Sequence, residues 1–441
     1  ELEEIVVTAN PLRATALELA QSAIVLAGDD LARSVAASLG ESLASQPGVT
    51  ASYFGPKASR PIIRGQSGER VLMLLDGVSA LDVSNLSPDH SVSVEPLLAD
   101  QIEILKGPTT LLYGSGAVGG VVNTVDGRIP MRKDREPIEG GLELRADTAS
   151  EERSIAGRLD GAVGSFAWHV DGYSRDTSDI EIPGLDWSKA VIAEKTAEGE
   201  PIEATSGYVP NTDSESDGIT AGFAWVGERS LVGFAWGRAE TNYGLPGPAE
   251  HAHEEAPPGA AVAALAEEDE AVRIDQTADR YDFKAEWREL GGLIDNVALR
   301  AAYTDYEHDE LEGDEIGTSF EQTGLDTRLH LGHRAIAGWT GTLGVQYTDL
   351  DLEAIGAEAY IPPAQTTGLA AFLVEQQRFG DWTVDFGGRL ERQEIDVETA
   401  ARAYDGTAFS AAAGLLWDFK PDLTLALHLT HSERHPHAAE L

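Results

Sequence analysis

A two-residue alternation of apolar and polar side chains dominates the chain from residue 138 to its end. In residues 281–287, Tyr, Phe, Ala and Trp alternate with Asp, Lys and Glu, and in residues 423–429 four leucines alternate with Thr, Ala and His. The pattern recurs in residues 142–148, 166–171, 297–308, 343–348 and 382–391. Because successive side chains of a strand point to opposite faces, each stretch predicts a strand with one apolar and one polar face. About a dozen such strands of roughly ten residues are expected, the length that crosses a bilayer when tilted.

Two architectures use strands of this kind. A soluble sandwich buries the apolar face, whereas an outer-membrane barrel turns it toward lipid and keeps the polar face for an aqueous lumen. The connections distinguish them, because short turns at 164–165 and 227–229 contrast with long acidic or Pro-rich loops at 177–215, 242–278 and 351–365. Short turns on one side and long loops on the other are typical of an outer-membrane barrel.

The first 137 residues follow a different pattern. Of the 30 aromatic residues only Tyr53, Phe54 and Tyr113 precede residue 138. Short apolar runs at 71–75 and 102–105 are each closed by a turn signal, which predicts a small α/β unit. A helix is expected over residues 29–44, with Asp29 or Asp30 as its N-cap.

Composition excludes several classes of function. Asp and Glu number 75 against 32 Lys and Arg, a net charge of −43, so the chain cannot neutralise phosphates and no nucleic-acid partner is expected. With no Cys, any metal must be held by His, carboxylate or backbone oxygen.

Catalytic motifs are not found in the sequence. Residues 114–119 satisfy the dinucleotide pattern G-x-G-x-x-G, but the strand-like residues 120–125 follow where a helix is required. No G-x-S-x-G elbow, P-loop or H-E-x-x-H is present, so the chain is predicted not to be an enzyme and to need no cofactor for catalysis.

Five segments carry a family resemblance. The first is Glu4, Ile5, Val6, Val7, Thr8 and Ala9, which resembles a TonB box. Residues 60–65, 74–77, 102–108 and 111–123 then follow in the order of the plug of a TonB-dependent outer-membrane receptor. The resemblance implies a mostly β protein, with an N-terminal α/β plug domain inside an antiparallel transmembrane β-barrel. Residues 1–12 would be the TonB-box segment, 13–137 the plug and 138–441 a partial barrel.

The strand count differs from the family pattern. Barrels of this type close with about 22 strands, whereas about thirteen are expected here, and an open sheet would leave lipid-exposed edges. The C-terminal strands are therefore expected to be missing.

The resemblance also implies a function: active transport across the bacterial outer membrane. TonB, with its inner-membrane energising complex, would take up the box as an added strand, and we expect the box to be mobile at rest. The outer-membrane lipid would surround the barrel. Within the family, residues 84–90 and 432–434 resemble the zinc-uptake (ZnuD-like) branch, which implies Zn²⁺ as cargo. A ferric-siderophore or haem receptor is the alternative, and a passive porin or adhesion barrel is disfavoured because it would lack box and plug.

Three groups of residues are candidate metal ligands. The branch resemblance assigns the first pair, Asp89 and His90, to metal binding. His308 and Glu310 share one strand face by their i, i+2 spacing and would point into the lumen. His251 and His253 belong to an H-x-H-E-E run in a long loop, which suits a borderline cation such as Zn²⁺. A single site is not expected for the four C-terminal histidines, because His428 and His431 would point to opposite faces of a strand. These residues, His428, His431, His435 and His437, are expected to face loops.

Overall fold

The computed structural model describes most of the chain. The described residues are Val7, Thr8, 21–107, 109–131, 137–199, 202, 204–247, 271–313, 315–356, 359, 361–398, 403–420 and 423–441. None of the described helices is long and apolar enough to cross a membrane.

A five-stranded mixed sheet forms the N-terminal domain. Its strand order is β1 (Ala23–Ala27), β6 (Gln101–Lys106), β7 (Gly120–Val125), β4 (Val71–Leu75) and β5 (Val78–Ser79). Only the β4–β7 pair is parallel. The apolar runs predicted from the sequence are β4 and β6. Most of their buried side chains pack with the helices into one core, and Leu74 and Leu105 belong to a second cluster. A second, small sheet pairs β2 (Val49–Ala51) with β3 (Pro61–Ile63), and α3 (Thr110–Tyr113) precedes β7. The α/β domain is as predicted.

The predicted helix over residues 29–44 is wrong in its extent. Two short helices occur instead, α1 (Gly28–Ser34) and α2 (Leu39–Leu43), with extended backbone between them. Ser38 caps α2 by accepting from the Glu41 amide, which is the N-cap bond that a Ser side chain favours. Asp29 and Asp30 lie in the first turn of α1 and not at its N-cap.

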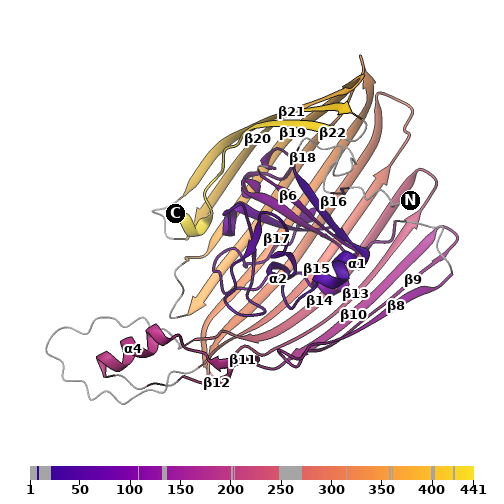
Figure 1. The fold of residues 1–441 in the computed structure, drawn as a ribbon. Coiled ribbons are helices and arrows are strands. Elements are labelled where there is room, and N and C mark those ends of the chain that lie inside the picture. Colours follow the sequence, from indigo (N-terminus) through magenta and orange to yellow (C-terminus); the bar gives the residue numbers. More distant parts are fainter. Residues whose placement is uncertain are drawn as a thin grey trace.

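Thirteen antiparallel strands form one large sheet that curls around the plug (Figure 1). The strands are β8 (Glu139–Ala146), β9 (Arg153–Val163), β10 (Phe166–Thr177), β13 (Ser214–Val226), β14 (Ser230–Gly244), β15 (Val272–Trp287), β16 (Ile294–Glu312), β17 (Glu315–Ile336), β18 (Trp339–Gly356), β19 (Ala364–Phe379), β20 (Trp382–Val397), β21 (Tyr404–Lys420) and β22 (Leu423–His431). Their spatial order follows the chain order from β8 to β22. Every strand predicted from alternation lies in this sheet.

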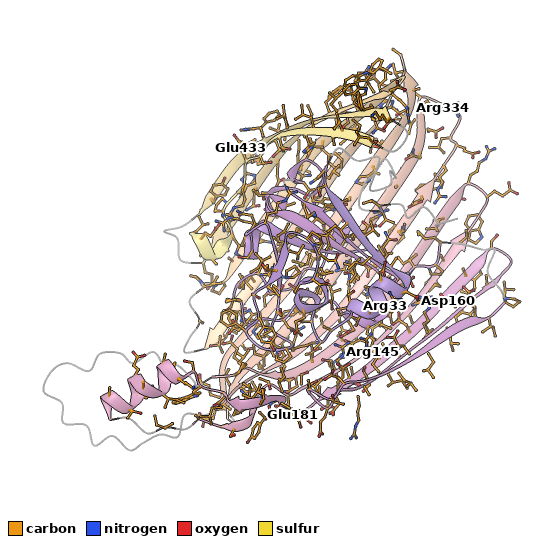
Figure 2. The ribbon with its side chains drawn as sticks, viewed as in Figure 1. Arg33, Arg145, Asp160, Glu181, Arg334 and Glu433 are labelled. Atoms are coloured by element: carbon orange, nitrogen blue, oxygen red, sulfur yellow. The ribbon has the colours of Figure 1, made fainter. Side chains whose placement is uncertain are left out.

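The predicted strand length of roughly ten residues is wrong for the central strands. β16 has 19 residues and β17 has 22. The extra length lies toward the long loops, where outward positions such as Asp305 and Glu307 are acidic and the alternation is lost. The predicted loop 177–215 also contains structure: β11 (Ile180–Leu185) pairs with β12 (Ser206–Val209), and α4 (Lys189–Glu198) lies between them. Figure 2 shows Glu181 and Arg334 near opposite ends of the sheet, the loop end and the turn end.

The two faces of the sheet differ as predicted. Along β13, Phe223 and Trp225 are exposed outward, whereas Ala224 is fully buried toward the plug. The thirteen-stranded sheet forms a wall around the plug, and polar side chains on its inward face bind the plug. Arg128 of the plug lies 2.9 Å from Asp282 of β15, and Arg280 donates to the carbonyls of Ser79 and Ala80. At the β8 edge of the sheet, Arg145 donates to the Val35 carbonyl at 2.8 Å (Figure 2).

Candidate metal centre

A turn of the plug carries His90 toward the wall. The His90 amide donates to the Ser87 carbonyl, which closes a turn that contains Pro88. The imidazole is 1% exposed and its Nδ1 lies 3.1 Å from the Val83 carbonyl oxygen. The turn therefore presents the other ring nitrogen, Nε2, to the wall.

Strand β16 supplies two further ligand groups from the wall side. His308 and Glu310 both point inward, since Asp305 and Glu307 occupy the alternate, outward positions. His308 is fully buried and Glu310 is partly buried. The i, i+2 prediction that places both side chains in the lumen agrees with this arrangement.

The three side chains converge on one point. His90 Nε2 lies 3.0 Å from Glu310 Oε1, and His308 Nε2 lies 3.8 Å from the same oxygen. All three ligand atoms lie within 4.8 Å of one another. Two ligands of a tetrahedral Zn²⁺ with bonds of about 2.0–2.1 Å are separated by roughly 3.3 Å, so the cluster has the dimensions of a metal site.

Hydrogen bonding fixes which nitrogen of His90 carries a proton. A backbone carbonyl can only accept, so Nδ1 must donate to Val83 and neutral His90 has its lone pair on Nε2. That lone pair then faces the Glu310 carboxylate at 3.0 Å. Two groups can join these atoms: a proton on Nε2, with which His90 donates to Glu310, or a metal cation that takes the place of that proton.

The surroundings of His308 also suit a metal ligand. Its Nδ1 lies 3.0 Å from the Tyr306 hydroxyl, while its buried Nε2 has no hydrogen-bond partner among the described residues. Phe320 of β17 stacks on the His308 ring at 4.7 Å and meets the His90 ring edge to face. A ligating histidine whose second nitrogen is held by a neighbour is typical of metal sites.

Other predicted ligands lie elsewhere. Asp89 is outside the three-residue cluster, because its carboxylate accepts a bond from the Ser87 hydroxyl within the turn. A short Asp side chain beside a Pro satisfies the local backbone and hydroxyl groups first. His251 and His253 lie outside the described residues.

Within the predicted TonB box, only Val7 and Thr8 are described; Glu4, Ile5, Val6 and Ala9 are not. Val7 is fully buried against the plug core, and Thr8 donates to Glu103 Oε1 from its amide at 2.6 Å and from its hydroxyl at 2.7 Å. Buried contacts and a buried carboxylate thus hold these two residues in this structure. The mobility expected of the box stays a prediction.

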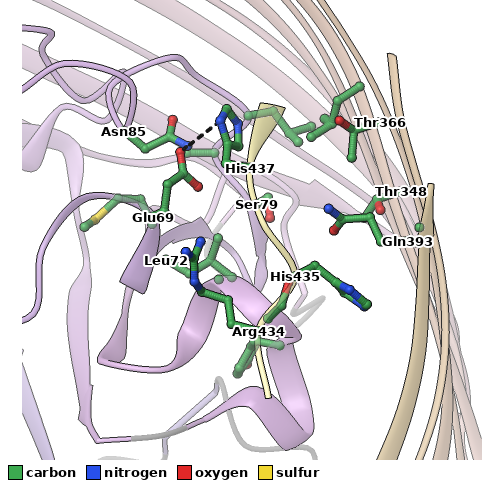
Figure 3. Close-up of a pocket in the computed structure, with 18 of the residues that line it drawn as sticks. Glu69, Leu72, Ser79, Asn85, Thr348, Thr366, Gln393, Arg434, His435 and His437 are labelled. Carbon is green, nitrogen blue, oxygen red and sulfur yellow. Dashed lines mark hydrogen bonds and ion pairs between the residues drawn. The ribbon is translucent and has the colours of Figure 1, made fainter. Parts of the chain in front are cut away.

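The C-terminal histidines do not form one site in the described structure. His435 bonds the Tyr404 hydroxyl at 2.8 Å, and His437 Nδ1 lies 3.6 Å from Glu69 Oε1, which also accepts from Asn85 (Figure 3). Burial raises the pKa of the Glu69 carboxyl above its usual range, although His437 opposes the shift. Glu69, Asn85, His435 and His437 border a cavity of about 190 Å³ between the plug and β17–β20. Its polar lining is mixed in charge and selects no ligand class.

Sequence reasoning missed the residues that support the cluster. Tyr306 precedes His308 by two positions and therefore shares its face, so this neighbour could have been inferred from alternation. Phe320 on β17, Tyr243 on β14 and Gln276 on β15 come from other strands, and their proximity depends on register that a single sequence does not specify.

Models of two protein domains match the chain. The TonB-dependent receptor plug domain matches residues 15–121, and the TonB-dependent receptor-like β-barrel matches residues 201–441. The chain belongs to the TonB-dependent receptor family. This is a family of receptors and not an enzyme class. The mostly β fold with a plug domain and a β-barrel, which the resemblance implied, is therefore confirmed. The predicted domain bounds, 1–12, 13–137 and 138–441, stay predictions.

Known relatives of this TonB-dependent receptor differ in cargo. A hemin receptor from Yersinia pestis is 29% identical over 216 residues, which cover 46% of this chain and 31% of the relative; the hemin receptor from Yersinia enterocolitica is 28% identical over 213 residues. The match thus spans about a third of these relatives. Among solved structures, the copper transporter OprC has a TM-score of 0.72 at 15% identity over 95% of this chain and 64% of its own. The FrpB iron transporter from Neisseria meningitidis (F3-3 variant) has a TM-score of 0.70 at 13% identity over 92% and 64%. These structures establish the shared fold.

Proposed function

We propose that this receptor takes up a divalent metal ion, with zinc favoured, across the bacterial outer membrane in a TonB-dependent manner. The convergence of two imidazole nitrogens and one carboxylate at the plug–wall interface carries the proposal. TonB, driven by its inner-membrane complex, would engage Glu4–Ala9, and outer-membrane lipid would contact the apolar face of the barrel.

The ligand chemistry favours a borderline ion. Imidazole and carboxylate suit Zn²⁺, whereas copper(I) prefers the thiolates and thioethers of Cys and Met. The chain has no Cys and two Met. His90, His308 and Glu310 supply three ligands, and the fourth would be water, Asp89 after a turn rearrangement, or a donor from the His251–His253 loop. This ligand set is consistent with the zinc-uptake branch.

A haem or siderophore receptor is the second candidate, because the relatives from Yersinia are hemin receptors. Haem needs an open slot for a flat macrocycle beside its axial ligand. His90 is 1% and His308 0% exposed, so these imidazoles sit in a closed interface that suits a bare ion better.

Titration of the purified chain in detergent micelles with Zn²⁺ tests the proposal by calorimetry. His90→Ala and His308→Ala should each weaken binding by at least about tenfold, since a site of four ligands loses geometry and charge with each one removed. His333→Ala is the matched control, because this histidine lies on the outward face of β17 beside Glu375. Equal zinc affinity in all four proteins would refute the assignment.

A further inference from the structure

The hydroxyl of Tyr243 holds the backbone on both sides of His90. Tyr243 lies on β14 and is 1% exposed. Its hydroxyl donates to the Asp89 carbonyl at 3.0 Å and accepts from the Ser91 amide at 2.9 Å. One wall side chain therefore satisfies the two peptide groups that flank the histidine.

Gln276 of β15 makes a second attachment just beyond the first. The Ser91 hydroxyl donates to Gln276 Oε1 at 2.8 Å, and Gln276 Nε2 donates to the Ser93 hydroxyl at 2.9 Å. Both ends of the amide are used, which fixes its orientation. Gln276 is 3% exposed, so these bonds are shielded from water.

The two attachments and the wall ligands belong to three neighbouring strands. Gln276 on β15 lies directly opposite His308 on β16 in the strand register, and Tyr243 lies opposite Ile274, two residues from Gln276. The turn at residues 89–93 thus rests on β14 and β15 while His90 reaches β16. The wall surface that seats the turn is continuous with the surface that supplies His308 and Glu310.

We propose that Tyr243 and Gln276 are positioning residues for the metal centre: they seat the turn so that His90 Nε2 meets His308 and Glu310. The inference rests on the proposed function of that centre. Neither side chain contributes a ligand atom to the cluster. Without the Tyr243 hydroxyl, the Asp89 carbonyl and the Ser91 amide lose their partner, and the imidazole is no longer held at ligand distance from β16.

Zinc titration of Tyr243→Phe is the first arm of the test. Loss of a group that orients a ligand typically weakens metal affinity by about 10- to 100-fold, and that range is expected here. Ser91→Ala should give a smaller loss, because the Ser91 amide still bonds Tyr243. Tyr173→Phe on β10 is the matched control, a partly buried wall tyrosine with no hydrogen bond to residues 89–93 among those of the described residues, and should bind zinc as the parent chain does.

A double-mutant cycle separates positioning from general damage. With His90→Ala in the background there is no imidazole on the turn to position, so adding Tyr243→Phe should weaken the residual zinc binding by less than about twofold. Equal losses in both backgrounds, or unchanged affinity of the single Tyr243→Phe variant, would overturn the inference. If the parent chain itself fails to bind zinc, or if His90→Ala has no effect, the proposed function fails instead. Should Tyr243→Phe not fold, Ser91→Ala carries the same cycle.

Discussion

At the scale of single residues, the local partner of each polar group decides its role. The sequence placed His308 and Glu310 on one face because alternation determines parity. It did not determine that Asp89 would bond Ser87 while its neighbour His90 reaches the wall. Adjacent residues of a turn point in different directions, and which one meets the barrel depends on the docking of the plug.

Asp76 provides a pH-dependent test at this scale. Burial raises the pKa of its carboxyl to about 7, and the nearby Asp126 adds to the shift. The unfolded value is near 3.9, so between about pH 4 and 7 the folded plug holds a proton that the unfolded chain has lost. The stability contributed by this group is complete below pH 4 and is lost as pH rises through 7.

Asp76→Asn should flatten that dependence. Asn mimics the protonated acid and tolerates the positive φ of 50° at this position. Hydrogen exchange of the β4 and β7 amides, corrected for intrinsic rates, should show more protection than the parent at pH 8, a smaller excess at pH 5, and equal protection only near pH 4. Asp29→Asn on the exposed face of α1 serves as control. If protection in Asp76→Asn changes with pH as steeply as in the parent, other groups cause the pH dependence.

At the scale of elements, strands were predictable and their ends were not. Alternation located every sheet strand that it was applied to, but the outer parts of β16 and β17 carry polar residues on both faces, which removes the signal. The helix over residues 29–44 was predicted as one element, whereas backbone at 35–38 is extended and tied to the barrel by Arg145. A tertiary bond of this kind overrides local helix propensity.

The TonB-box segment gives an element-scale prediction about energy coupling. Val6→Pro removes a backbone donor and should break strand addition to TonB. Zinc binding by calorimetry should be unchanged, while uptake of radioactive zinc by cells that express the receptor should fall to background. Leu2→Pro, outside the box, should transport normally. Normal uptake by Val6→Pro would remove Glu4–Ala9 as the coupling segment.

The contacts of Thr8 predict how the segment is restrained. Glu103 accepts two bonds from Thr8 through one oxygen, and its other oxygen accepts from Asn123 at 3.1 Å. Glu103→Gln replaces one of these acceptors by a donor, so the segment should detach more often. Because the chain lacks Cys, a spin label on Ala9→Cys reports this as narrower spectral lines. Glu143→Gln on β8 is the control, and identical spectra in all variants would show that Glu103 does not restrain the segment.

At the scale of the whole molecule, the architecture was predictable and the cargo less so. Period-two strands, unequal connections and five ordered motifs in the sequence are enough to indicate a plug inside a barrel. The cargo depends on a few atoms contributed by segments as distant as His90 and His308, whose separation is set by how the whole plug seats in the wall. The net charge of −43 excludes nucleic acid, yet it does not discriminate among cations.

The last prediction discriminates between cargoes with one variant and two ligands. If the centre binds a bare ion, His90→Ala should weaken zinc binding by at least about tenfold. The Soret spectrum of added haemin should be the same with this variant as with the parent chain, because a closed interface of 0–1% exposed imidazoles does not admit a macrocycle. If the centre instead ligates haem, the plug turn must leave the wall, and the Soret shift should appear with the parent and vanish in His90→Ala. Phe320→Ala gives a further comparison, because it removes the ring that packs on both imidazoles and opens space beside them. This variant should admit haemin more easily and should bind zinc more weakly than the parent chain. A His90-dependent haemin spectrum without zinc binding would replace the metal ion by haem and leave the plug, the barrel and the TonB box as described.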